Sequence, residues 1–306
     1  MSVALENRPA ATVDALALTM AGAFVVLWSS GFIGAKFGVP YAGAFTFLTL
    51  RFWLALALLL PALVLWRTPW PQSWADAGHM AVAGILLNVG CLGGCFYAIS
   101  LGLPSAIVAV IGGLQPLLTG VVAGTLLGER VSARQWLGLS LGFAGIVMVL
   151  SDKLTLGSAP PLAIVTAFLG LLGITGATLY QKRFCTGIPL RSGAAIQLAA
   201  SSMITFPIAL AMDGFAVHWT GEFVLALLWL AGGLSIGALM LLWALVRRGA
   251  ASKVSSLFYL TPPTTAVMGW AFFGERFGTL ALIGMTVVVI GVALATRQQP
   301  AVKTAS

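Results

Sequence analysis

The sequence predicts an all-α integral membrane protein of ten transmembrane helices, arranged as two inverted five-helix repeats. Three observations support this prediction: the apolar composition, ten separate apolar segments, and a short charged motif that occurs twice. Of the 306 residues, 59% are hydrophobic and 8% are charged, and the mean hydropathy is +1.02. Soluble domains carry about 25% charged residues, so this composition indicates a chain whose main solvent is lipid.

Ten apolar segments are each long enough to cross the bilayer core of about 30 Å. Together they cover most of the chain and leave no room for a separate soluble domain. The first segment is long and its flanking charges are mixed, so we expect it to be retained rather than cleaved as a signal peptide. The segments lie near residues 15–37, 44–66, 77–99, 104–127, 132–150, 160–182, 192–212, 221–246, 250–273 and 278–296.

The basic residues lie mainly between these segments, where they determine orientation. With a cytoplasmic N-terminus, only Lys36, Lys153 and Arg276 fall in the outer segments. The positive-inside rule therefore places both tails, residues 1–14 and 297–306, in the cytoplasm. The pI of about 9.9 reflects this topology, and we expect no nucleic-acid partner. The basic residues of the inner segments are Arg8, Arg67, Arg130, Arg134, Lys182, Arg183, Arg191, Arg247, Arg248, Lys253, Arg297 and Lys303.

The motif Gly-Glu-Arg at 128–130 recurs at 274–276, 146 residues later. The same offset, without a gap, aligns Lys36 with Lys182, Pro116 with Pro262 and Gly138 with Gly284. A constant offset over so long a stretch indicates a duplication, with a first repeat over residues 15–150 and a second over 160–296. Because five is an odd number of helices, the second repeat must enter the membrane from the opposite side, as in many transporters.

Each copy of the motif falls at a turn between two apolar segments. Gly128 and Gly274 can end the preceding helix. The following Glu129 or Glu275 is then expected to cap the next helix and to pair with its neighbour, Arg130 or Arg276. A glutamate that carries protons during transport is the alternative.

These features resemble the drug/metabolite transporter (DMT) superfamily, in its EamA-type branch. The resemblance rests on residues 97–130, which end in the Gly-Glu-Arg motif, and on 27–40 followed by 48–61, which include Arg51. It implies an EamA-like inner-membrane transporter. Within the branch, the aromatic-rich, short-looped chain looks most like the YddG-type exporters of aromatic and neutral amino acids. The second repeat departs from the first, since Gln197 stands in place of Arg51 and Ile174 in place of Trp28.

Polar and aromatic side chains inside the apolar segments are the candidate substrate contacts, because such groups must find a partner or line a wet cavity. Pro116 and Pro262 are expected to kink their helices and to act in gating, and the freed backbone groups would bind the charged ends of a zwitterion. The candidate cavity residues are Trp28, Ser30, Asn88, Tyr97, Gln115, Thr119, Tyr180, Trp243, Tyr259 and Thr261.

Each assignment has a structural alternative. Ser30 and Thr119 can bond the preceding helical carbonyl, and the two amides, Asn88 and Gln115, can join helices. Tyr97 and Trp243 can belong to the aromatic belt at the membrane interface. The prolines can serve packing alone.

The acidic residues decide between functions. All eight lie at or beyond the edges of apolar segments, so we expect a nearly neutral cavity and no embedded proton carrier.

Cys91 and Cys95 share a helix face but lack further ligands, and we expect no metal and no cofactor. An intramembrane enzyme is disfavoured because no paired acids or activated nucleophile lie within the segments.

The sequence therefore predicts an exporter of neutral or aromatic amino acids and related zwitterionic metabolites, acting by alternating access with facilitated or weak coupling. Its partners are small-molecule substrates and the lipid bilayer. An exporter of drugs or other metabolites is the alternative. A channel or receptor is more remote, because the chain has no ring of charge and no sensor segment. The coupling ion and the oligomeric state stay open, and a monomer is compatible with the sequence.

Overall fold

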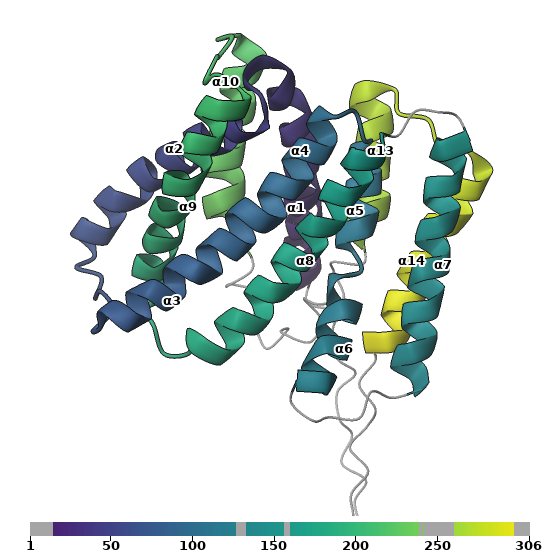
Figure 1. Cartoon of the computed structure of the whole chain (residues 1–306), viewed down its shortest axis with the longest axis horizontal. Helices are drawn as coiled ribbons and strands as arrows, with labels where there is room; N and C mark the ends of the chain where they lie inside the picture. The colour runs from purple at the N-terminus through teal and green to yellow at the C-terminus, as the bar shows by residue number, and fades with distance from the viewer. Residues whose placement is uncertain (1–14, 127–132, 156–159, 239–240, 242–259, 297–306) are drawn as a thin grey trace, which may run out of the picture.

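The computed structural model describes residues 15–126, 133–155, 160–238, 241 and 260–296, and every regular element in this part of the chain is a helix (Figure 1). Two of these elements, named η, are π-helical stretches: η1 joins α3 to α4, and η2 continues α10. The elements are α1 (Ala15–Ala42), α2 (Ala44–Leu65), α3 (Trp74–Gly84), η1 (Ile85–Gly93), α4 (Gly94–Ser100), α5 (Ser105–Gly112), α6 (Gln115–Leu126), α7 (Ala133–Thr155), α8 (Pro161–Phe184), α9 (Leu190–Met212), α10 (Gly221–Leu228), η2 (Trp229–Ala238), α13 (Thr261–Phe273) and α14 (Thr279–Thr296).

The helices present apolar side chains outward as well as inward. Met203 is 75% exposed and Leu225 is 69% exposed, as suits side chains that face lipid. Each predicted apolar segment is mainly helical over its described part, and the segment 104–127 is interrupted at residues 113–114. Within the described residues, the helices that are both long and apolar enough to cross a membrane are Thr19–Ala42, Ala44–Leu65, Trp74–Ser100, Pro161–Phe184 and Arg191–Met212. The count of ten crossings remains a prediction.

Helices of the second half begin at the spacing of the repeated sequence. Four of them start 146 residues after a helix of the first half, and each half holds one π-helical stretch in its third apolar segment. The paired starting residues are 15 and 161, 44 and 190, 115 and 261, and 133 and 279.

Corresponding helices also pack against each other, α2 against α9 at one edge of the bundle and α7 against α14 at the other (Figure 1). Glycines bring α7 and α14 close. A Cβ added at Gly145 would lie 2.6 Å from the carbonyl oxygen of Gly284, and one at Gly291 would lie 2.7 Å from that of Gly138. Residue numbers rise along one helix as they fall along the other, so the pair is antiparallel. The inversion of the whole halves across the membrane remains a prediction.

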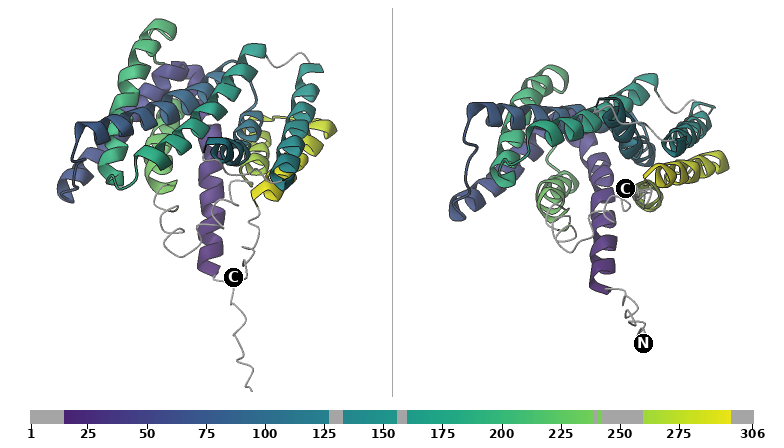
Figure 2. Two further views of the ribbon diagram at one scale, coloured as in Figure 1. Left: turned by 60° about the horizontal axis from the view of Figure 1, so that its bottom comes forward. Right: turned by 90° about the horizontal axis from the view of Figure 1, so that it is seen from below.

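The helix α1 is central and contacts elements of both halves, including α2, α4, α5, α10, η2 and α13. Figure 2 shows its amino-terminal part extending beyond the other described helices. Beside it, the ring of Phe47 packs on Phe96 at 5.6 Å and on Phe223 at 5.2 Å between centroids. Gly38 of α1 leaves room for Phe47, since a Cβ there would meet that ring at 2.0 Å. This aromatic cluster joins α2, α4 and α10.

The two candidate kink prolines lie in the first turns of helices, not within continuous ones. An interruption separates α5 from α6, and Pro116 follows it as the second residue of α6. The N–H of Gly113 still bonds the carbonyl of Ala109 at 2.9 Å, so the amide at the interruption is satisfied. Pro262 likewise stands near the start of α13. A proline is tolerated in the first turn because the N–H it lacks has no helical partner there.

Candidate functional site

A cavity of about 330 Å³ lies among helices of both halves. The first half contributes residues of α1, α2, η1, α4, α5 and α6, and the second contributes residues of α8, α9, η2 and α13. Its volume and its mostly apolar lining are typical of small-molecule sites, which span roughly 300–1,000 Å³. The side chains in this lining that carry an amide, hydroxyl or guanidinium are Arg51, Asn88, Gln115, Gln197, Ser235 and Thr261.

Five residues singled out in the sequence line this cavity: Trp28, Asn88, Gln115, Pro116 and Thr261. They come from α1, η1, α6 and α13, so positions far apart in the sequence meet at one place. The interruption between α5 and α6 and the start of α13 both border the cavity. Gln115 begins α6 and Thr261 begins α13, and the two positions correspond under the repeat. Equivalent helix starts therefore line the cavity from the two halves.

The two amides line the cavity and also join helices. Asn88 donates from its side-chain nitrogen to the hydroxyl of Ser201 on α9 at 3.0 Å. Gln115 donates to the hydroxyl of Thr178 on α8 at 3.0 Å. The two interpretations of these residues, cavity contact and helix joint, therefore apply together. A hydrogen bond that fixes the amide also fixes which of its atoms faces the cavity.

Other predicted contacts lie outside the cavity lining. Tyr97 packs on the ring of Phe45 at 5.9 Å between centroids. The hydroxyl of Tyr180 lies 2.9 Å from Nδ1 of His79, and its ring packs on Phe184 at 4.7 Å, near the carboxyl end of α8. Each ring therefore contacts an aromatic side chain of another helix, Phe45 of α2 for Tyr97 and His79 of α3 for Tyr180.

The two smaller polar candidates also lie outside the lining. Ser30 donates to the carbonyl of Leu27 at 2.6 Å and accepts from Nε1 of Trp229 at 2.8 Å. The hydroxyl oxygen of Thr119 is buried, and it has no hydrogen-bond partner within the described residues. Trp243 and Tyr259 fall outside the described residues.

Arg51 is a cavity residue that the candidate set omitted. It is 6% exposed, and its guanidinium carbon stands 5.9 Å from the ring centroid of Phe96. Its buried Nε has no hydrogen-bond partner in the described part of the chain, and no carboxylate stands among the described lining residues. The expectation of a nearly neutral cavity is therefore corrected to a cationic one. The signal was present in the sequence, since an ionisable residue inside an apolar segment indicates function by default.

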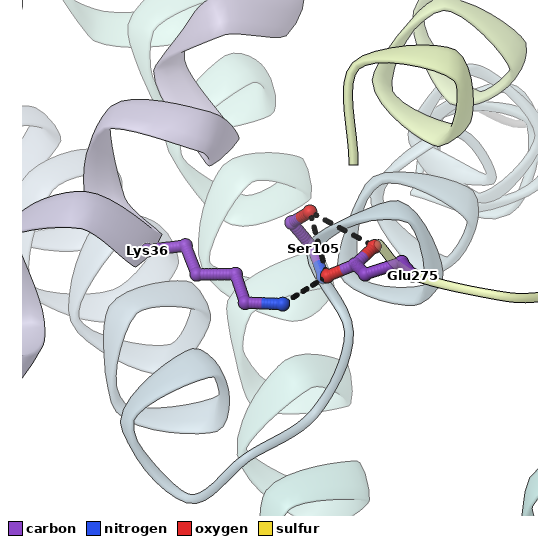
Figure 3. A network of polar contacts seen from close by, with 3 residues as sticks. All are labelled: Lys36, Ser105 and Glu275. Atoms are coloured by element: carbon purple, nitrogen blue, oxygen red, sulfur yellow. Dashed lines mark hydrogen bonds and ion pairs between the residues drawn. The ribbon is translucent and has the colours of Figure 1, made fainter. Parts of the chain in front are cut away.

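A second polar feature lies where α1 approaches the turn between α13 and α14 (Figure 3). Glu275, 9% exposed, forms an ion pair with Lys36. It also accepts hydrogen bonds from the backbone N–H and the hydroxyl of Ser105, each at 3.3 Å. Gly274 ends α13 with a φ of 61°, in the left-handed region that favours glycine. Gly269 leaves space for the carboxylate, because a Cβ there would lie 2.3 Å from Glu275 Oε2.

This arrangement corrects the expected role of Glu275. Ser105 is the first residue of α5, so the carboxylate caps a helix of the other half, while α14 begins only at Thr279. The partner outside the turn is Lys36, which lies 239 positions away in the sequence. The first copy of the motif, Gly128, Glu129 and Arg130, lies outside the described residues.

Two more carboxylates of the second half bond groups of the first half at the same end of the bundle. Asp213, which follows α9, accepts from the backbone N–H of Thr46 in the first turn of α2 at 2.7 Å. Glu222 in the first turn of α10 accepts from the hydroxyl of Tyr41, near the end of α1. With Glu275, these three carboxylates tie the halves together where α1 ends.

The sequence matches the EamA-like transporter family twice, over residues 15–151 and 161–297. It is 25% identical to the uncharacterized inner membrane transporter YedA of Escherichia coli, over 90% of this chain and 88% of that protein. It is 22% identical to a probable amino-acid metabolite efflux pump of the same organism, over 87% and 90%.

The fold has a counterpart among solved structures. One, described as "Crystal structure of protein", superposes with a TM-score of 0.62 at 19% identity, covering 92% of this chain and 97% of that one. Two family matches of equal length, a helical bundle built from both and a shared cavity between them lead to one conclusion: this chain is a membrane transporter of the EamA-like family.

Proposed function

We propose that this transporter exports neutral and aromatic amino acids and related small metabolites across the inner membrane by alternating access. The observation that carries the proposal is the cavity between the halves, which is small, mostly apolar and supplied with a few polar groups. The similarity to a probable amino-acid metabolite efflux pump and to an inner membrane transporter supports it further.

The lining suits a compact molecule with an apolar body. Trp28, Phe32 and Phe96 offer aromatic surface on which an apolar or aromatic side chain would pack. The amides of Asn88 and Gln115 offer polar partners near that surface. Their positions are held by hydrogen bonds to neighbouring helices, which keeps the site preorganised.

The three interhalf carboxylates suggest how access is controlled. With both termini in the cytoplasm, the end of the bundle where α1 finishes lies outside. Asp213, Glu222 and Glu275 would then hold the outer side closed in this conformation, and their release would accompany opening. The described cavity lining contains no carboxylate, which supports facilitated or weakly coupled export.

Transport by purified protein in liposomes tests the proposal. We expect exchange of labelled phenylalanine or leucine, strongly reduced by Trp28→Ala. Trp270→Ala is the matched control, because Trp270 is 64% exposed on α13 and does not line the cavity. Transport of a hydrophobic drug without any amino-acid exchange would favour the alternative, an exporter of drugs or other metabolites.

A further inference from the structure

We propose that Arg51 binds the carboxylate of the transported molecule, so that the cavity selects carboxylic acids over their amides and over cationic compounds. The inference rests on the proposed function for one point, that the cavity between the halves is the transport site. It adds the chemical group that the site recognises.

The position of Arg51 is the first argument. The residue lies within the membrane-spanning helix α2 and is 6% exposed. It lines the cavity, and its guanidinium carbon lies 5.9 Å from the ring centroid of Phe96, another lining residue. A buried charge is costly unless it is paired and hydrogen-bonded. The Nε of Arg51 is buried and has no hydrogen-bond partner among the described residues, so this donor of the guanidinium is unpaired in the described conformation. An arginine presents its donors as a planar fork that matches a carboxylate in two parallel hydrogen bonds.

The placement of the acidic residues is the second argument. In the described part of the chain, the buried carboxylate of Glu275 is committed to Lys36 and Ser105, and those of Asp213 and Glu222 to Thr46 and Tyr41. None of the three lines the cavity. A ligand carboxylate would neutralise Arg51, whereas a ligand with a net positive charge would be repelled by it.

The repeat supplies the third argument. Gln197, which corresponds to Arg51 at the 146-residue offset, lines the same cavity from α9. The fold therefore places a neutral amide at one of the two equivalent positions and a guanidinium at the other. A purely structural role common to both positions would not need the charge. It also follows that Arg51→Gln introduces a side chain that the fold already accommodates at the equivalent site.

The test compares four ligands that differ in one group at a time: phenylalanine, phenylalaninamide, 3-phenylpropionate and 3-phenylpropionamide. Binding to the full chain in lipid nanodiscs is measured by calorimetry. We expect both carboxylates to bind more tightly than their amides. Arg51→Gln should weaken carboxylate binding by about 10- to 100-fold, the range for one charge-assisted contact, and leave the binding of 3-phenylpropionamide unchanged. Phenylalaninamide, which carries an ammonium group and no carboxylate, should bind more tightly to this variant because the repulsion by Arg51 is removed. Arg51→Lys should fall between, because it keeps the charge and loses the fork.

Two controls make the outcome decisive. Arg134→Gln removes an exposed arginine at the start of α7 and should change none of the four affinities. If Arg51→Gln does not fold, the double variant Arg51→Gln with Gln197→Arg moves the charge to the equivalent position, and the acid-to-amide ratio of the unmodified protein is still measurable. Equal binding of acids and amides by the unmodified protein, or no binding of either carboxylate at millimolar concentration, would overturn the inference.

The proposed function can fail separately. If the carboxylates bind in an Arg51-dependent manner but no amino acid crosses the liposome membrane, amino-acid export is wrong and carboxylate recognition stands. If amino acids cross and Arg51→Gln transports them with unchanged KM and unchanged discrimination against amides, export stands and the inference is overturned.

Discussion

The contact between Lys36 and Glu275 joins the two halves, and the cost of removing it can be worked from its surroundings. The side chain of Glu275 is 6% exposed and that of Lys36 is 29% exposed. Charge-assisted hydrogen bonds contribute about 1.5–3 kcal/mol each, and pairs at the surface contribute only about 0–1 kcal/mol. With one buried partner and one that is partly solvated, we expect a coupling free energy of about 1–2 kcal/mol.

A double-mutant cycle isolates that coupling. Glu275→Gln keeps an acceptor for Ser105 and removes the charge, and Lys36→Met keeps most of the side-chain volume. Each variant should lower the free energy of unfolding by about 2 kcal/mol, and the double variant should cost about 1–2 kcal/mol less than the sum. The assay is reversible unfolding in mixed micelles. As a control, Lys36→Met combined with Asp213→Asn should be additive to within about 0.5 kcal/mol, because Asp213 bonds Thr46 and shares no partner with Lys36.

Gly269→Ala perturbs the same carboxylate from the other side. The new Cβ would lie 2.3 Å from Glu275 Oε2 and must displace it from Ser105. The cost of Gly269→Ala should therefore shrink when Glu275 has already been replaced by alanine.

A coupling below about 0.3 kcal/mol between Lys36 and Glu275, with both single variants folded, would refute the assignment of this pair as a tie between the halves.

Three further predictions concern packing and topology. Gly145→Ala should destabilise the protein by about 1–3 kcal/mol in thermal unfolding, because its Cβ would lie 2.6 Å from the Gly284 carbonyl oxygen; Gly176→Ala, with nothing within 4 Å, should be neutral or stabilising. Asn88→Leu should cost about 1–2 kcal/mol through the lost bond to Ser201, measured in the same way. Gln72→Cys and His218→Cys, exposed and 146 positions apart, should be labelled from opposite sides in a variant without native cysteines; labelling of both from one side would contradict the inverted repeat.

The helical architecture could be predicted because its signals are local. Apolar length marks the membrane segments whatever their neighbours are, and the 146-residue offset seen in the sequence recurs in the helix starts. The prolines show where local reasoning stops. Pro116 was expected to bend a helix, but whether a helix bends or is interrupted depends on the residues before the proline. Here Gly112 and Gly113 allow the interruption, and the amide of Gly113 still finds a carbonyl.

The site was harder to predict because it depends on which face of a helix meets which neighbour. Trp28 and Tyr180 look alike in the sequence, as aromatic residues in apolar segments, yet one lines the cavity and the other bonds His79. The partners of Glu275 lie 239 and 170 positions away, beyond the reach of any local pattern. Arg51 differs, since its charge within an apolar segment was a sufficient signal by itself.

The duplicated fold carries unequal chemistry at its two ends, and this inequality bears on the transport cycle. Asp213 bonds Thr46, but the positions that correspond to them in the first and second repeats are Arg67 and Ser192, and an arginine cannot accept a hydrogen bond from a backbone N–H. Tyr41 corresponds to Gly187, which has no hydroxyl to donate.

Two of the three ties at the end where α1 finishes therefore cannot be reproduced at the opposite end by exchanging the roles of the halves. If the protein alternates access as we propose, a conformation closed at that opposite end would be held by different contacts. The two conformations would then differ in free energy, since the bonds of Asp213 to Thr46 and of Glu222 to Tyr41 belong to the one described here.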